Sequence, residues 1–271
     1  MNKTSFFNSL FKDFQQTALL WKKDDVLQLK QFCINNVDSE FQVNNPHKKL
    51  RLGKWVEQFV SFQLKQISSI KILSENLQIQ DYKQTIGELD LLFEEEKQPI
   101  HLEIIYKFYL YDNSKIYNNL LEYWIGPNRN DTLIYKLKKL KERQLPLLYH
   151  NKTKKALENL NLRAEDFKQY VNFKAQLFLP YNNQNVDIDP LNTDCIQGWY
   201  LNFEKISMLK NYLFYIPEKL EWINSPHNAV DWLAFENFII EIEKSIAQKR
   251  SPLCWIKDNT NGFQKCFITW W

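Results

Sequence analysis

TIGELDLLFEEEKQPIHLEIIYKFYLY, residues 85–111, is the most informative stretch of the sequence. Two runs rich in branched and aromatic residues, 85–93 and 100–110, flank a charged segment at 94–99. Such runs are typical of β-strands, and the charged segment is typical of a turn. We therefore expect two neighbouring strands joined by a short connection.

Carboxylates interrupt both expected strands. Because alternate side chains of a strand share a face, Glu88 and Asp90 lie together on the first strand. His101 and Glu103 share a face of the second strand in the same way. A carboxylate in an apolar strand is costly unless it is paired or bound to a metal. Adjacent strands lie about 4.8 Å apart, so Asp90 and Glu103 can converge on one hard cation such as Mg²⁺. The alternatives are solvated carboxylates on half-exposed strands and a structural role for His101.

Apolar periodicity along the rest of the chain indicates a mixture of helices and strands. Helices are expected within 1–35 (a stripe at 1–14 and a second run at 26–32) and at 47–66, 115–123, 131–144 and 228–248. Further strands are expected at 69–77, 174–179, 198–203, 212–216, 219–223, 253–256 and 266–271, with a loop at 181–192. The expected fold class is α/β (α+β), a mixed sheet core flanked by helices. We divide the chain into an N-terminal helical segment (1–46), a core (47–180) and a C-terminal α+β extension (181–271) packed on the core.

The composition indicates a globular protein and excludes several other classes. The 271 residues are 44% hydrophobic and 25% charged, which is typical of a globular protein and argues against fibrous or disordered chains. A net charge of +3 does not mark a nucleic-acid binder, so a polyanion site must come from local clustering. The four cysteines form no CxxC pair, which argues against a disulfide framework or zinc ribbon and favours a reducing cytoplasm. No run approaches the roughly 18 apolar residues that span a bilayer, so we expect a soluble cytoplasmic protein without a membrane partner.

The segment GELDLLF (87–93), followed by Glu103 on the next strand, resembles the PD-(D/E)XK nuclease superfamily. The resemblance implies a restriction-endonuclease-like core in which Asp90 and Glu103 hold Mg²⁺ or Mn²⁺. It also implies a helical carboxylate, which Glu57 in LGKWVEQFV matches and which we expect to point into the same pocket. Glu88 matches a position that is often acidic but not essential.

The catalytic lysine of that superfamily usually stands two residues after the glutamate, where this chain has Ile105. The nearest lysine on the strand is Lys107, and its Cα is about 13 Å from that of Glu103 in a regular strand. Lys54, one helical turn before Glu57, is the other candidate. In the mechanism that the resemblance implies, Lys107 or Lys54 stabilises the charge that develops on the phosphate.

A closer resemblance covers nearly the whole chain. HLEIIYKFYL (101–110) and GPNRNDTLIYKLKKLKERQLPLL (126–148) look like an uncharacterised bacterial family labelled domain of unknown function eighteen fifty-three. That family is itself placed in the PD-(D/E)XK superfamily. Because its biochemical role is not known, the resemblance implies a fold more than a function.

Basic side chains gather in the second of these segments. They are Arg129, Lys136, Lys138, Lys139 and Arg143. Lysine and arginine supply most sequence-independent binding to phosphates, so a helix over 131–144 would suit a nucleic-acid backbone. A solvated helix face above a packed apolar stripe is the alternative.

These observations favour a Mg²⁺-dependent nuclease that hydrolyses phosphodiester bonds of nucleic acid, with DNA favoured over RNA. A non-catalytic module that keeps the fold and binds nucleic acid or a protein partner is the second hypothesis, and the position of Ile105 favours it. An enzyme that acts on another phosphorylated substrate is the third. No P-loop, GxSxG, HExxH or GxGxxG motif occurs in the sequence.

Overall fold

The computed structural model describes residues 3–22, 26–43, 50–183 and 185–271. Within these residues the chain is a mixed α+β protein with nine strands, and this fold class agrees with the prediction from sequence. The chain divides into two compact units. The first unit comprises residues 1–106 and 135–174, and the second comprises residues 107–134 and 175–271.

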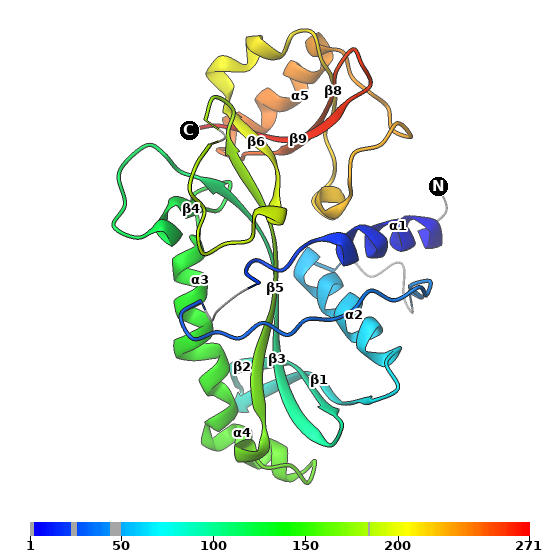
Figure 1. Cartoon of the computed structure of the whole chain (residues 1–271), viewed down its shortest axis with the longest axis vertical. Helices are drawn as coiled ribbons and strands as arrows, with labels where there is room; N and C mark the ends of the chain where they lie inside the picture. The colour runs from blue at the N-terminus through cyan, green and yellow to red at the C-terminus, as the bar shows by residue number, and fades with distance from the viewer. Residues whose placement is uncertain (1–2, 23–25, 44–49, 184) are drawn as a thin grey trace. The chain divides into compact units, whose positions relative to one another are not determined.

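The helices and strands are labelled in Figure 1. The helices are α1 (Lys3–Gln16), α2 (Leu52–Lys65), α3 (Leu133–Lys139), α4 (Asn151–Glu158) and α5 (Phe235–Ala247). The strands are β1 (Ile70–Asp81), β2 (Gln84–Glu95), β3 (Gln98–Tyr111), β4 (Trp124–Ile125), β5 (Lys168–Pro180), β6 (Ile196–Asn202), β7 (Leu213–Tyr215), β8 (Leu253–Lys257) and β9 (Phe263–Thr269). Strands β3 and β5 are neighbours in the sheet, and each runs from the first unit into the second.

In the first unit, β2 has two different halves. It pairs antiparallel with β1 along its whole length, but its ladder with β3 runs only from Glu95↔Gln98 to Leu91↔Leu102. Apolar side chains of β1 and β2 pack with the segments around α4; the cluster comprises Ile79, Leu89, Leu92, Leu148, Leu157, Ala164 and Phe167. The first half of β2 is therefore a hairpin arm whose buried leucines hold it against the segments around α4.

In the second unit, β5, β6 and β9 pair in parallel, and β8 and β7 continue the sheet in antiparallel fashion. The core of this unit packs α5 against these strands; its buried members include Trp199, Phe214, Phe238, Cys254, Cys266 and Ile268. All four cysteines of the chain are free, in agreement with their spacing in the sequence.

The helix predicted at 26–32 is wrong. Leu27 (φ 53°) and Gln28 (φ 65°) have left-handed backbone conformations, which an α-helix of L-residues does not accommodate. Residues 26–29 form a turn instead, in which the N–H of Leu29 donates to the carbonyl of Val26 at 3.0 Å, and the N–H of Phe32 then donates to the carbonyl of Val171 in β5 at 2.8 Å. Val26 and Leu29 are therefore buried from the two ends of a turn and not from one face of a helix.

Two shorter segments also differ from the prediction. The strand predicted at 219–223 is wrong, because Glu221–Ile223 is a 3-10 turn and the Glu221 carboxylate accepts from the N–H of Glu218. The helix predicted at 115–123 is wrong for most of its length, because only Leu120–Tyr123 is helical, as a 3-10 turn. In both places, a local hydrogen bond from a backbone N–H to a side-chain oxygen favours a turn over a longer element.

The helix expected at 228–248 begins only at Phe235, as α5, and the other helices lie close to their predicted positions. The helix expected at 131–144 is α3 followed by a π-helical turn, Leu140–Gln144. The helix expected at 47–66 is α2, and residues 47–49 lie outside the described residues. None of the described helices combines the length and the apolar character needed to cross a membrane.

Candidate functional site

The site begins where β2 parts from β3. The last pair of their ladder is Leu91↔Leu102, and one further step would place Asp90 opposite Glu103. At that point a side chain replaces the backbone as the hydrogen-bond acceptor, because Asp90 Oδ2 accepts from the backbone N–H of Ile104 at 2.9 Å. Asp90 is thus fixed at the fork between the two strands.

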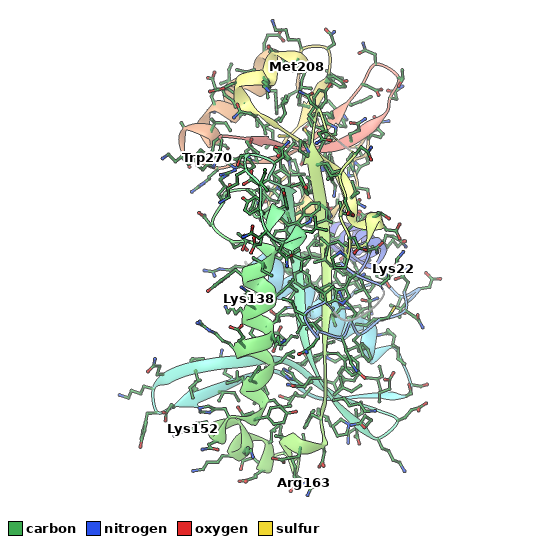
Figure 2. The ribbon with its side chains drawn as sticks, turned by 60° about the vertical axis from the view of Figure 1, so that its left-hand side comes forward. Lys22, Lys138, Lys152, Arg163, Met208 and Trp270 are labelled. Atoms are coloured by element: carbon green, nitrogen blue, oxygen red, sulfur yellow. The ribbon has the colours of Figure 1, made fainter. Side chains whose placement is uncertain are left out.

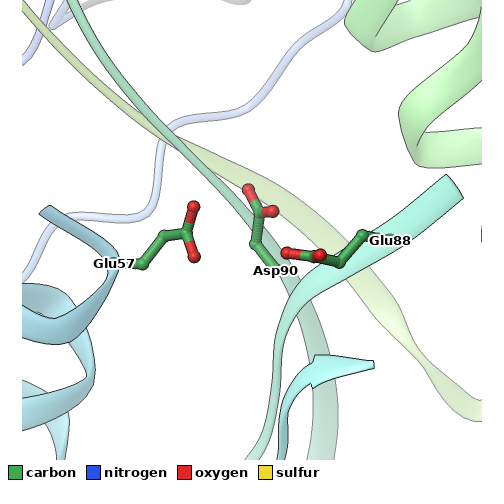
Figure 3. A group of neighbouring side chains, drawn as sticks. All are labelled: Glu57, Glu88 and Asp90. Atoms are coloured by element: carbon green, nitrogen blue, oxygen red, sulfur yellow. The ribbon is translucent and has the colours of Figure 1, made fainter. Parts of the chain in front are cut away.

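Three carboxylates converge at this fork. Glu57 extends from α2, and Glu88 and Asp90 extend from β2; Figure 3 shows their carboxylates turned toward one another. One oxygen of each lies within 4.8 Å of an oxygen of both others. We call Glu57, Glu88 and Asp90 the acidic cluster. Glu57 therefore points to the same place as Asp90, and Glu88 belongs to the group as fully as the other two.

Lys54 supplies a positive charge to the acidic cluster. Its Nζ donates to Glu57 Oε2 at 2.7 Å, to Asn76 Oδ1 at 2.8 Å and to the carboxylate of Glu88. Burial alone would lower the pKa of Lys54, but the hydrogen bonds to Glu57 and Glu88 outweigh burial and raise it. Lys54 therefore stays protonated.

Asn76 is the neutral hydrogen-bond partner of Lys54, and its backbone conformation is uncommon for a residue in a strand. Its φ is 53°, in the left-handed region, although it lies within β1. It sits between the pairs Glu75↔Leu91 and Leu77↔Leu89, across from Asp90. Left-handed residues inside a strand are strained and concentrate at functional sites. This conformation accompanies the approach of the Asn76 side chain to Lys54.

The acidic cluster contains three carboxyl groups, and one ammonium, that of Lys54, pairs with two of them. Burial raises the pKa of Asp90 well above its usual value, and the nearby charge of Glu103 raises it further. Burial also raises the pKa of Glu57, against the opposing effect of Lys54. Both shifts mean that the ionised carboxylates lack full compensation, which is the condition under which a divalent cation binds favourably.

Glu103 is fully buried beside this cluster and is held by its own partners. His101 Nε2 lies 3.1 Å from Glu103 Oε1, and the side-chain amide of Gln144 donates to Glu103 Oε2. The amide of Gln169 donates to the Leu145 carbonyl and lies 3.0 Å from His101 Nδ1. With Nδ1 as acceptor, His101 carries its proton on Nε2 and donates it to Glu103. His101 thus orients Glu103.

A pocket of about 650 Å³ opens beside the acidic cluster. Its lining includes two members of the acidic cluster, Glu88 and Asp90. It also includes two basic residues, Lys139 at the end of α3 and Arg143 in the π-helical turn that follows. Gln144, which holds Glu103, also lines it. Lys139 and Arg143 are exposed and stand one helical turn apart, since Arg143 lies on the π-helical turn that continues α3.

The other basic residues singled out in the sequence lie elsewhere. Lys136 donates to Gln144 Oε1 at 2.7 Å, and Lys138, labelled on α3 in Figure 2, is exposed and does not line the pocket. Lys107 and Arg129 belong to the second unit, where they form ion pairs with Asp131 (2.6 Å) and Asp112 (2.9 Å).

Sequence reasoning assigned no role in the site to Asn76, Tyr149 or Gln144. Asn76 could have been noticed, because asparagine is uncommon inside a strand of apolar pattern. Tyr149, which lines the pocket from a 3-10 turn (Leu145–Tyr149), carried no signal of its own. Gln144 stood within the segment that resembles the uncharacterised family, but no contact with Glu103 was expected.

Comparison with known proteins gives one match. A family model described as Domain of unknown function (DUF1853) matches residues 15–265. No curated protein and no solved structure matches the chain. Because the match covers most of the sequence, the chain belongs to the family of proteins with this domain of unknown function.

Proposed function

We propose that the chain is a phosphodiesterase with a restriction-endonuclease-like core that hydrolyses nucleic acid with Mg²⁺ or Mn²⁺. One observation carries this proposal: the same pocket is lined by the carboxylates of Glu88 and Asp90 and by the cations Lys139 and Arg143. Cations attract the phosphate backbone, and carboxylates can hold a metal ion beside it. Solvated surface charges would not need to meet in one cavity.

The acidic cluster fits a hard divalent cation. Its three carboxylates lie within reach of one another, and carboxylate oxygens are the ligands that Mg²⁺ and Mn²⁺ favour. The raised pKa of Asp90 supports the same assignment, because added positive charge would stabilise the ionised carboxylate that burial and the charge of Glu103 disfavour. Such an ion, when bound, would polarise the scissile phosphate and lower the pKa of a bound water.

The other side chains have roles that follow from their contacts. The ammonium of Lys54, aimed by Asn76 and Glu57, can stabilise negative charge that develops on the phosphate. It would serve in place of the lysine that the superfamily carries where Ile105 stands. Glu103, held by His101 and Gln144, has a fixed position next to Asp90. DNA is the favoured substrate, with RNA as the other.

A second candidate function is a non-catalytic module that binds nucleic acid or a protein partner. One observation favours it: Lys54 already pairs with two of the three carboxylates in the acidic cluster. An ammonium that stays there would compete with a metal ion. In that case the pocket would bind without cleaving.

The experiment pairs metal binding with cleavage. Titration calorimetry with Mn²⁺ is followed by incubation of single-stranded and duplex DNA with the purified protein and Mg²⁺ or Mn²⁺. Asp90→Asn keeps an acceptor for the N–H of Ile104 but removes the charge, so it tests electrostatics with little change in backbone pairing. We expect it to weaken Mn²⁺ binding and to slow cleavage by at least about a thousandfold, the value of several kcal/mol of lost metal assistance. Glu95→Gln, in the same strand but outside the acidic cluster, is the matched control.

Three outcomes separate the candidates. Loss of both metal binding and cleavage in Asp90→Asn, with Glu95→Gln unchanged, supports the phosphodiesterase. Cleavage that persists in a highly purified Asp90→Asn sample rejects this site. Binding of DNA by the wild-type chain without cleavage under any metal condition favours the non-catalytic module.

A further inference from the structure

The pocket beside the acidic cluster has an apolar part as well as a charged one. Its apolar lining comprises Ile86, Pro146, Leu147 and Tyr149. Two of these side chains are unusually open to solvent, with Tyr149 45% and Ile86 40% exposed. An exposed aromatic ring next to cations is typical of surfaces that bind single-stranded nucleic acid, where bases stack on rings and phosphates meet lysine and arginine.

The size of the pocket suits one nucleotide. Its volume of about 650 Å³ falls within the range of small-molecule sites, about 300–1,000 Å³. Gly87 forms part of the wall, and a Cβ added there would come within 2.6 Å of Leu147 Cδ2. The missing side chain lets the turn that carries Leu147 and Tyr149 lie against β2. The apolar wall is therefore held next to Glu88.

We propose that this pocket holds one unpaired nucleotide of a single-stranded nucleic acid, with its base against Tyr149 and its phosphate at Lys139 and Arg143. The inference rests on the proposed function, because Glu88 and Asp90 belong both to the pocket and to the acidic cluster. The faces of a base inside a duplex are covered by its neighbours, so only an unpaired base can stack on Tyr149. The substrate class is a single strand or the unpaired end of a duplex.

Binding without cleavage tests the inference directly. In EDTA, fluorescence anisotropy measures the affinity for a labelled oligothymidylate dodecamer and for a duplex of the same length at one salt concentration. We expect the single strand to bind at least about tenfold more tightly. Tyr149→Ala should weaken that binding by about 5- to 150-fold, the effect of losing one base–aromatic stack. Tyr149→Phe keeps the ring and should bind as the wild type does.

Two controls isolate the stack from general effects. Tyr135→Ala removes another exposed tyrosine, 58% exposed and on α3, that does not line the pocket, and it should leave affinity unchanged. An abasic dodecamer offers phosphates without bases, so Tyr149→Ala should not change its affinity. Tyr149→Leu is measured as well; it keeps apolar bulk without the ring and guards against a misfolded alanine variant. Thermal melting, monitored by circular dichroism, verifies that each variant is folded.

The results also distinguish this inference from the function on which it rests. Equal or tighter binding of duplex, or unchanged binding by folded Tyr149→Ala and Tyr149→Leu, overturns the inference. Duplex cleavage by Tyr149→Ala at the wild-type rate leaves the phosphodiesterase standing and the inference overturned. Tyr149-dependent binding of the single strand, with no cleavage in Mg²⁺ or Mn²⁺, supports the unpaired-nucleotide pocket and rejects the phosphodiesterase.

Discussion

Asp90 in the first unit is half-buried and Asp112 in the second is buried, and their surroundings act on their pKa values in opposite directions. Asp112 accepts hydrogen bonds from Ser114 and Tyr117 and pairs with Arg129, and these contacts outweigh burial and lower its pKa. Burial raises the pKa of Asp90, the nearby charge of Glu103 raises it further, and one backbone N–H, that of Ile104, opposes them by a hydrogen bond. A buried carboxylate with enough partners is structural, whereas one left short of positive charge is available to a ligand.

The largest expected effect concerns cleavage. Glu88→Gln removes a charge from the acidic cluster and should slow Mg²⁺-dependent hydrolysis by about a thousandfold. Asp112→Asn should leave the rate per folded molecule unchanged, because Asp112 is saturated by partners of its own unit. Initial rates on labelled DNA, normalised to the folded fraction, measure both. Equal losses in the two variants would break the comparison.

Each unit also contains a buried lysine, Lys174 in the first and Lys265 in the second, and in both cases oxygen acceptors surround the ammonium. Lys174 donates to three backbone carbonyls at the end of α1, at 2.7–3.1 Å. Lys265 donates to the side chain of Gln176 and to the carbonyls of Trp222 and Ile223. Lys174→Met and Lys265→Met should each lower the free energy of unfolding by about 3 kcal/mol, since each leaves buried acceptors unsatisfied. Urea denaturation measures the loss, and a cost near zero in either variant would show that water replaces the ammonium.

Nucleic-acid affinity should depend on unpaired cations only. The double variant Lys139→Gln/Arg143→Gln removes the two cations of the pocket, and should flatten the log–log salt slope by about 1.4–1.8. Arg129→Gln should change the slope little, because Arg129 is committed to Asp112 and stacks on Trp271 at 4.1 Å. Binding isotherms at several salt concentrations give both slopes. The reverse order of effects would move the nucleic-acid surface away from the pocket.

The smallest expected effects are changes in the free energy of unfolding, measured in EDTA, and they should have opposite signs in Asp90→Asn and Asp112→Asn. The raised pKa of Asp90 makes the folded state lose stability as pH rises through that pKa, so Asp90→Asn should stabilise at neutral pH, with the gain vanishing below the usual carboxyl range. The lowered pKa of Asp112 contributes stability that is lost as pH falls through it, so Asp112→Asn should destabilise at neutral pH and less so in acid. Denaturation curves from acid to neutral pH measure both. Parallel pH profiles would contradict the comparison.

Much of the first unit could be predicted from sequence. The two strands could be predicted from their branched and aromatic runs, and their carboxylates stood out because a carboxylate in an apolar strand is costly, but the fork was not predicted. The role of Glu88 was underestimated, since the resemblance ranked it below Glu103. Glu88 joins the acidic cluster because the β2–β3 ladder ends at Leu91, and in the described pairings the part of β2 before Leu91 pairs with β1 alone. Pattern alone does not show where a ladder stops.

Other features depended on tertiary contacts that no local pattern encodes. An asparagine inside a strand could be noticed, but no local pattern predicts its contact with Lys54, which joins residues 22 positions apart. The 26–32 segment has apolar spacing that suits a helix, but residues 26–29 form a turn and Phe32 pairs with β5. Gln144 reaches Glu103 from a π-helical turn, a local widening that apolar periodicity does not predict.

The interleaved order of the two units has a consequence for synthesis on the ribosome. The chain passes between them at 106/107, 134/135 and 174/175. Neither unit is one contiguous piece, so the first cannot close before Lys174 has emerged, by which time part of the second is already made. A truncation after residue 134 would release the β1–β3 arm without the α3–α4 segment that supplies Leu148 and Leu157 to its core. Nascent chains of that length would expose apolar strands and need protection from aggregation.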